Sequence, residues 1–332
     1  MADPAGRAGQ TVREVLAAAR VRLEQAGIET AALDARVLFE YILAKPHAWF
    51  YANSDVVVPQ SDLARFDDLL ARREEREPIS QIVGNREFWS LLFEVTGDVL
   101  TPRPDSESLI EGVLEHLPDR TKTYRFLDLG TGSGCLLLTL LSEYSAASGV
   151  GIDVSPAALQ VASRNGARLH IDARVDWMLG SWDTKLDADF DVVISNPPYI
   201  ESAALVTLDR DVVDYDPHLA LDGGADGLDA YRAILANVSS LMAENGVVVF
   251  EIGEGQADAI TILAKANGLQ LRSSRDDLSG ITRVLVFQHE TIESQQRKKC
   301  LENKSVPPRV PKSDLAHAAC GDHYPLSFLR KL

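Results

Sequence analysis

Asn196, Pro197, Pro198 and Tyr199 are the residues whose types and order most directly suggest chemistry. They follow the apolar segment FDVVIS, which predicts a buried strand, so the motif lies where a strand ends. A planar amide or amino nitrogen is a poor nucleophile because its lone pair is delocalised, and it reacts only when held in line with the bond that breaks. The Asn196 side-chain oxygen and the Pro197 carbonyl can each accept one of its N–H groups. Both acceptors would stabilise the positive charge that develops on the nitrogen.

The other two residues of this motif have supporting roles in the same interpretation. Two consecutive prolines, Pro197 and Pro198, stiffen the loop so that both acceptors point at one spot. Tyr199 can pack on the face of a planar group. A dedicated general base is not required, because the proton leaves a nitrogen that formation of the C–N bond has acidified. A simple Asn-Pro turn is the alternative reading of these four residues.

A glycine-rich turn lies upstream, directly between a predicted strand and a predicted helix. Its residues are Gly130, Thr131, Gly132, Ser133 and Gly134. Three features favour S-adenosylmethionine over a dinucleotide as its ligand. The glycines are spaced GxGxG rather than GxGxxG, Asp128 precedes them, and the next predicted strand ends in Asp153, whose carboxylate can accept hydrogen bonds from both ribose hydroxyls. The alternatives are a tight strand-to-helix turn for the glycines and a helix cap for Asp153.

Other residues near these motifs are weaker candidates. Trp182 follows a short predicted strand and lies either near an adenine ring or in ordinary packing. Arg103 and Glu107 flank the cleft if the helix predicted from about 106 to 117 covers it, and otherwise they begin a solvated helix. Cys135 enters a helix after Gly134, which predicts burial rather than reactivity. The histidines occur singly, so no metal site is predicted.

The elements that position these motifs alternate between strand and helix. Strands are predicted at 124–130, 148–155, 190–200, 247–253 and 282–288, and helices at 135–144, 156–169, 230–246 and 257–268. This order predicts an α/β fold with a doubly wound, mainly parallel sheet. Ligands bind such sheets at the carboxyl ends of the strands. Each motif described above follows one of those ends.

The remaining segments differ in character. Residues 1–80 predict helices with apolar stripes and no chemistry of their own, the first opening with a capping box at Thr11 and Glu14. Residues 81–100 are rich in aromatic and β-branched residues and predict a strand or hairpin linker. Residues 101–289 hold the alternating domain. The tail at 290–332 has scattered charge, Pro307, Pro308 and Pro311 within five residues, and no period, so it is expected to be disordered.

Composition excludes several classes of protein. The formal net charge of −16 argues against nucleic acid as the main ligand, since a phosphate-binding surface is normally basic. Three cysteines without a CxxC pair indicate neither a disulfide framework nor a zinc site, and the expected compartment is the reducing cytoplasm. No apolar run approaches the length of a membrane span, and the first ten residues do not resemble a signal peptide.

These segments together resemble a known family, the protein-(glutamine-N5) methyltransferases of HemK/PrmC type that modify peptide chain release factors. The match covers about residues 11–289. The most specific combination is PRPDSE at 102–107 with DPHLALDGGADGLD at 216–229, whereas NPPY is shared with adenine-N6 methyltransferases. The family usually has PRPETE, so Asp105 and Ser106 depart from it. Ser181 also departs, because an acidic residue commonly precedes the tryptophan.

The resemblance implies a class I methyltransferase sheet of seven strands with a small N-terminal helical domain. It implies that S-adenosylmethionine contacts Gly130 to Gly134, Asp153, Trp182 and Asn196. Asn196 to Tyr199 would hold the glutamine of the Gly-Gly-Gln motif of a class 1 release factor, and residues 1–80 would grip that protein. A ribosomal-protein glutamine methyltransferase, an adenine-N6 nucleic-acid methyltransferase and a non-catalytic S-adenosylmethionine-binding module are the alternatives.

Overall fold

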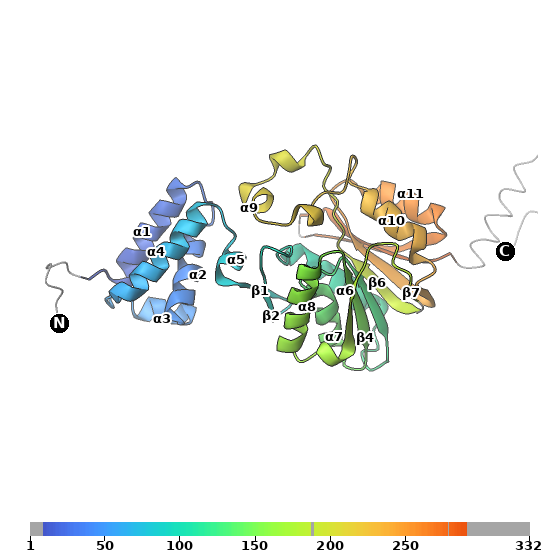
Figure 1. Cartoon of the computed structure of the whole chain (residues 1–332), viewed down its shortest axis with the longest axis horizontal. Helices are drawn as coiled ribbons and strands as arrows, with labels where there is room; N and C mark the ends of the chain where they lie inside the picture. The colour runs from blue at the N-terminus through green and yellow to red at the C-terminus, as the bar shows by residue number, and fades with distance from the viewer. Residues whose placement is uncertain (1–8, 187–188, 278, 291–332) are drawn as a thin grey trace, which may run out of the picture. The chain divides into compact units, whose positions relative to one another are not determined.

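The computed structural model describes residues 9–186, 189–277 and 279–290 (Figure 1). The tail predicted from residue 290 therefore lies outside the described residues, apart from Glu290 itself. Two kinds of architecture follow one another along the chain. A helical segment comes first, and an α/β sheet domain follows it after a short hairpin.

The helical segment packs around its own apolar core. Its helices are α1 (Val12–Gln25), α2 (Ala31–Leu43), α3 (His47–Ala52), α4 (Gln60–Glu74) and α5 (Ile79–Val83). The predicted capping box begins α1, with Thr11 Oγ1 accepting from the Glu14 amide and the Glu14 carboxylate accepting from the Thr11 amide. Phe39 and Phe66 pack with their ring centroids 4.7 Å apart. Burying these apolar side chains stabilises a bundle whose outer faces are charged.

A two-stranded hairpin connects the helices to the sheet. It consists of β1 (Asn85–Phe88) and β2 (Leu91–Glu94), paired antiparallel. Trp89 and Ser90 at its tip both have positive φ, which suits a two-residue hairpin turn. The strained Trp89 is held at both of its N–H groups, since its amide donates to Glu107 and its indole donates to Glu143. Phe88 and Phe93 then enter the core of the sheet domain.

The sheet has seven strands in the order β5-β4-β3-β6-β7-β9-β8. They are β3 (Arg125–Leu129), β4 (Ser148–Asp153), β5 (Val175–Leu179), β6 (Phe190–Ser195), β7 (Met242–Glu251), β8 (Leu269–Asp276) and β9 (Thr282–His289). Every pair from β5 to β7 is parallel, and β9 runs antiparallel to both of its neighbours. The predicted doubly wound, mainly parallel, seven-stranded fold with helices before it is confirmed.

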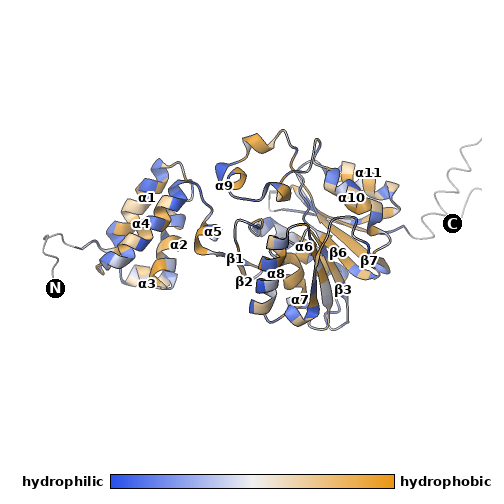
Figure 2. Cartoon of the chain, in the orientation of Figure 1, coloured by the Kyte–Doolittle hydropathy of each residue, from blue (hydrophilic) through white to orange (hydrophobic). Residues whose placement is uncertain are grey.

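Helices cover both faces of this sheet (Figure 1). They are α6 (Glu107–His116), α7 (Cys135–Glu143), α8 (Pro156–Arg168), α10 (Asp229–Val238) and α11 (Ala257–Ala266). The central strands are apolar on both sides, and Figure 2 shows them as mainly hydrophobic. Val247 and Val249 of β7 pack with α6 and α7, whereas Val248 and Phe250 pack with α10 and α11. Near-continuous apolar runs of this kind are typical of strands buried on both faces.

One predicted element extended too far, and one strand was missed. The helix predicted at 230–246 ends at Val238, and β7 already begins at Met242. Strand β8 was not predicted, because its segment LQLRSSRD is polar and Leu269 is its one buried residue. It lies at the sheet edge beside β9, where main-chain pairing rather than apolar burial holds it. The sequence pattern contains no signal for that pairing.

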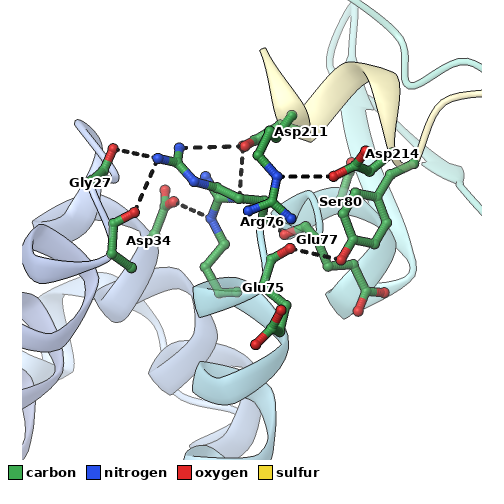
Figure 3. A network of polar contacts seen from close by, with 12 residues as sticks. Gly27, Asp34, Glu75, Arg76, Glu77, Ser80, Asp211 and Asp214 are labelled. Atoms are coloured by element: carbon green, nitrogen blue, oxygen red, sulfur yellow. Dashed lines mark hydrogen bonds and ion pairs between the residues drawn. The ribbon is translucent and has the colours of Figure 1, made fainter.

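An ion network joins the helical segment to the loop that follows β6 (Figure 3). The Arg73 guanidinium on α4 donates to Asp34 on α2 and pairs with Asp211, both at 2.7 Å. Asp211 belongs to the short helix α9 (Arg210–Val213) of that loop. Arg76 donates to the carbonyls of Ala26 and Gly27 and faces Asp211 as well. The Arg73 and Asp34 side chains are almost completely buried, so neither charge has water as a substitute partner.

We expect Arg73→Ala to lower the free energy of unfolding by about 3–5 kcal/mol, because it leaves Asp34 buried without a counter-charge. Chemical denaturation would measure this loss. Arg72→Ala is the matched control: Arg72 is the preceding residue of α4, and its exposed guanidinium pairs with Glu77, so its loss should cost about 1 kcal/mol or less. Equal free energies of unfolding for the Arg73 variant and wild type would contradict a stabilising role of this network.

Candidate active site

A cavity opens at the carboxyl ends of β3, β4 and β6. It holds about 1090 Å³ of empty space, part of it open to solvent. Of the residues predicted from the sequence, it is lined by Gly130, Thr131, Gly132, Ser133, Asp153, Trp182, Asn196 and Pro198. Its lining combines polar groups with apolar side chains, as small-molecule sites usually do. Motifs that are far apart in the chain, such as Gly130–Ser133 and Asn196–Pro198, thus meet at one cavity.

The glycine turn forms one wall of this cavity. Gly130, Gly132 and Gly134 all have φ between +54° and +78°, a region that other residues rarely adopt. The amides of Gly130 and Thr131 both donate to the Ile152 carbonyl of β4, which holds the turn against the neighbouring strand. A Cβ on Gly132 would meet no atom within 4 Å, so the backbone there is open to a ligand. These hydrogen bonds hold the backbone of the turn in place along the cavity.

Asp153 ends β4 and faces the same turn. One carboxylate oxygen accepts from the Gly132 amide at 2.9 Å, and the other accepts from the Ser155 amide at 2.9 Å. The N-cap of α8 is Ser155, whose hydroxyl accepts from Ala158, so the helix-cap reading of Asp153 was wrong. A carboxylate has about four lone-pair sites, so both oxygens can still accept a further donor from the cavity.

Asp128 lies beneath the glycine turn and does not line the cavity. Thr131 donates to one of its oxygens at 2.6 Å, and its Oδ1 has no hydrogen-bond partner among the described residues. Complete burial raises the pKa of this carboxyl to about 7, and the nearby charge of Asp153 acts in the same direction. Asp128 therefore supports the turn from below.

Trp182 packs on the turn itself. A Cβ placed on Gly130 would lie 2.9 Å from the Trp182 ring, so the two residues fit together because position 130 has no side chain. Trp182 also lines the cavity. Gly134 differs from the other glycines, because its missing Cβ would meet Trp177, Ala162 and Leu138 in the interior. Its predicted contact with a cofactor therefore has no support from this geometry, and its observed role is to begin α7.

Asn196 follows β6, and its side chain reaches Ser106, the residue before α6. Its Nδ2 donates to Ser106 Oγ at 3.3 Å. Pro197 is buried and is not a lining residue, whereas Pro198 lines the cavity. The Tyr199 hydroxyl lies 3.4 Å from Glu251 Oε1, and burial raises its pKa, with the Glu251 charge acting in the same direction. Tyr199 therefore packs behind the cavity wall and partly into the sheet core.

Several residues that support the Asn196–Tyr199 loop were missed in the sequence. The Gln256 amide nitrogen donates to the Tyr199 carbonyl at 3.0 Å, and its oxygen accepts from the Gly253 amide. Gly223 lies so close to the loop that a Cβ there would be 2.8 Å from the Pro198 carbonyl. Gly223 lies in the DPHLALDGGADGLD segment, which carried the family resemblance without an assigned role, and Gln256 ends the segment EIGEGQ at 251–256.

The PRPDSE segment divides into different roles. Arg103 lines the cavity and pairs with the buried Asp216 at 2.7 Å, which fixes the loop after β6 against the segment before α6. Ser106 lines the cavity beside Asn196. Glu107 does neither, because its carboxylate accepts from the Trp89 amide of the hairpin. The prediction that Glu107 flanks the cleft was wrong, because its carboxylate instead binds the Trp89 amide in the hairpin turn.

The cavity fits S-adenosylmethionine by the chemistry of its walls. Asp153 would supply an acceptor for ribose hydroxyls, Trp182 an aromatic face, and the open Gly132 backbone a place for close approach. Leu100, Leu136, Ile152 and Val154 supply an apolar lining. Among the described residues, no three His, Cys, Asp or Glu side chains form a group that could hold a metal ion.

Comparison with known proteins shows the same division of the chain. Residues 14–84 match the model of the PrmC N-terminal domain, and residues 105–215 match the methyltransferase small domain. A release factor glutamine methyltransferase of Rhodospirillum rubrum is 44% identical over 266 residues, covering 80% of this chain and 81% of the relative. One of Agrobacterium fabrum is 39% identical over 285 residues, covering 85% and 99%.

A solved structure has a similar fold. The hMettl16 catalytic domain, solved in complex with a MAT2A 3'UTR hairpin, superposes with a TM-score of 0.52 over 76% of this chain and 93% of that chain. At 13% identity the likeness concerns the fold alone. The fold, the cavity and the matched domains define a class I S-adenosylmethionine-dependent methyltransferase. Given its identity to the curated relatives over most of its length, the chain belongs to the release factor glutamine methyltransferase family.

We predict that Asp153→Ala weakens binding of S-adenosylmethionine by about 1–3 kcal/mol, the usual cost of leaving buried polar partners unsatisfied. Two effects act together, because the variant loses a ribose acceptor and also releases the Gly132 amide. Isothermal titration calorimetry would measure the change. Asp119→Ala is the control, because it likewise removes a carboxylate that accepts from a backbone amide but does not line the cavity. An unchanged Kd for Asp153→Ala would contradict the ribose role.

Proposed function

We propose that this chain transfers a methyl group from S-adenosylmethionine to the side-chain amide nitrogen of the glutamine in the Gly-Gly-Gln motif of class 1 peptide chain release factors. The observation that carries the proposal is the placement of Asn196 at a cavity suited to the cofactor, in a chain of this family. The curated relatives are named for release factors and glutamine. The specific motif and the class of release factor are our extension of that name.

The chain's own residues would act by placement and by charge stabilisation. Asn196 Oδ1 would accept one N–H group of the glutamine amide, which turns its nitrogen lone pair towards the cofactor. The main-chain carbonyl of Pro197 is proposed as the acceptor of the other, although Pro197 is buried and is not among the residues that line the cavity. When bound, S-adenosylmethionine would supply a sulfonium-activated methyl group that bonds to the glutamine nitrogen while the electron pair of the broken carbon–sulfur bond stays on sulfur. Both acceptors stabilise the cationic nitrogen until its proton passes to solvent.

The helical segment is proposed to grip the release factor. It carries no cluster of residues that suggests chemistry, and it exposes apolar side chains such as Tyr51, which is 76% accessible. The loop from Ile200 to Asp222 connects it to the site. That loop touches the helical segment through Asp211 and Tyr215, and it touches the cavity through Pro217, Leu219 and Ala220. A protein held by the helices would therefore lie near the cavity.

The net charge of the chain agrees with a protein substrate. The net charge of −16 favours a basic protein surface over nucleic acid as a partner. Among the described residues, none of the helices is both long and apolar enough to cross a bilayer. We propose the cytoplasm, where translation takes place, as the compartment in which the chain acts.

Asn196→Ala should lower kcat by about 100-fold or more, because the variant loses an acceptor aimed at charge that develops in the transition state. The Kd for S-adenosylmethionine should change much less, since the glycine turn, Asp153 and Trp182 are intact. Steady-state kinetics with a full-length release factor and calorimetry with the cofactor would separate the two effects. A normal kcat for Asn196→Ala would exclude this mechanism.

The substrate itself can be identified by labelling. We expect transfer of labelled methyl to full-length class 1 release factors, with mass spectrometry placing a single methyl on the glutamine of Gly-Gly-Gln. A release factor with that glutamine replaced by glutamate is the matched control and should stay unlabelled. A short peptide with the same motif should be a poor substrate, because it lacks the docking contacts. Labelling of a ribosomal protein or of DNA adenine, with none of release factors, would overturn the assignment.

A further inference from the structure

A chain of buried polar groups lies behind Asn196. Asn196 Nδ2 donates to Ser106 Oγ at 3.3 Å, and Ser106 Oγ donates to Glu251 Oε2 at 2.5 Å. The Tyr199 hydroxyl meets the other Glu251 oxygen at 3.4 Å. Ser106 and Glu251 are each 3% accessible. Two members of the Asn196–Tyr199 motif are thus connected to one buried carboxylate.

These contacts come from three separate elements. Asn196 follows β6, Glu251 ends the neighbouring parallel strand β7, and Ser106 ends the short 3₁₀ helix that precedes α6. Tyr231 of α10 donates to the Glu251 carbonyl at 2.7 Å, which fixes the end of β7 from the opposite face of the sheet. The carboxylate is therefore held by main chain and side chain before any ligand binds.

The direction of the hydrogen bonds in this chain determines which end of the Asn196 amide is free. An ionised carboxylate can only accept, so the single Ser106 proton goes to Glu251. Ser106 must then accept from Asn196, and Nδ2 is the only donor on that side chain. Oδ1 remains for an incoming N–H group. Without this bias the two ends of the amide have nearly the same shape and could exchange places.

We propose that Ser106 and Glu251 are positioning residues that fix the Asn196 amide with its oxygen presented to the glutamine nitrogen. The inference rests on the proposed function, and it adds the reason why the acceptor faces the substrate. A reversed Asn196 would present two donors to the two N–H groups of the glutamine amide. That arrangement would lose the interaction that places the nucleophile and would repel the charge that develops on it.

The titration of Glu251 supplies a second readout. Burial raises the pKa of this carboxyl to about 7, against the hydrogen bond from Ser106; Asp105 also raises it, whereas Tyr199 and Arg283 lower it. The Glu251 charge also acts on Cys135 and Tyr231, where it raises the pKa of each side chain in the same direction as burial does. A protonated Glu251 can donate to Ser106, which then donates to Asn196 and favours the reversed amide. The ionised form is the active one, so kcat should rise with pH through about 7.

The test compares Ser106→Ala, Ser106→Thr and Glu251→Gln as full chains with a release factor as substrate. Ser106→Ala should lower kcat by about 10- to 100-fold, as expected for a misplaced catalytic group. KM for the release factor should change little. Ser106→Thr keeps the hydroxyl and should restore kcat to within a few-fold of wild type. Glu251→Gln cannot ionise, so the rise of kcat between about pH 6 and 8 should disappear.

The outcomes separate this inference from the proposed function. Release-factor methylation by wild type, with a normal kcat in Ser106→Ala, would overturn the positioning role and leave the function standing. Equal loss in Ser106→Ala and Ser106→Thr would overturn it as well, since packing and not the hydroxyl would then matter. If Ser106→Ala does not fold, the isosteric Glu251→Gln decides, and a retained pH dependence counts against the proposal. Wild type that labels no release factor refutes both.

Discussion

The parallel register of four neighbouring strands is the constraint on which the rest of the structure depends. Leu129 of β3 aligns with Ile152 of β4, Asp128 of β3 aligns with Ile194 of β6, and Ser195 of β6 aligns with Phe250 of β7. Their carboxyl ends therefore reach the same edge of the sheet. The glycine turn, Asp153 and the Asn196–Tyr199 loop each begin within a few residues of such an end, so main-chain hydrogen bonds between strands set the distances between these side chains that are far apart in sequence.

The sheet can impose this register because it is apolar on both faces. Two separate cores, one under α6 and α7 and one under α10 and α11, pack against alternate residues of the same strands. A slip of one residue would turn each core-facing side chain to the opposite layer, which fixes the pairing strongly. The rigidity at the site is thus a consequence of burial far from it. The polar edge strand β8 shows the opposite case, where pairing alone suffices.

Two carboxylates are buried at the functional edge, and both hold up a loop that forms the cavity. Asp128 accepts from Thr131 of the glycine turn, and Glu251 accepts from Ser106 behind Asn196. Burial raises the pKa of each carboxyl to about 7. At pH values above the ordinary pKa of a carboxyl group, this shift lowers the free energy of unfolding. Each carboxylate accepts a hydrogen bond from a loop at a buried position that water does not reach. Such groups trade stability for a defined geometry, which is common at functional sites.

The sequence by itself determined the fold class, the strand ends at which the motifs lie and the types of residue at the site. Periodicity and glycine placement are local properties, and NPPY and GxGxG carry their chemistry in their residue types. The tertiary structure alone decided which polar groups meet. In the folded chain, Gly134 faces the interior and Glu107 accepts a hydrogen bond from the hairpin. Ser106 donates to Glu251, which is 145 residues away in the sequence. Those pairings depend on strand register and helix packing between distant segments, and no local pattern encodes such contacts.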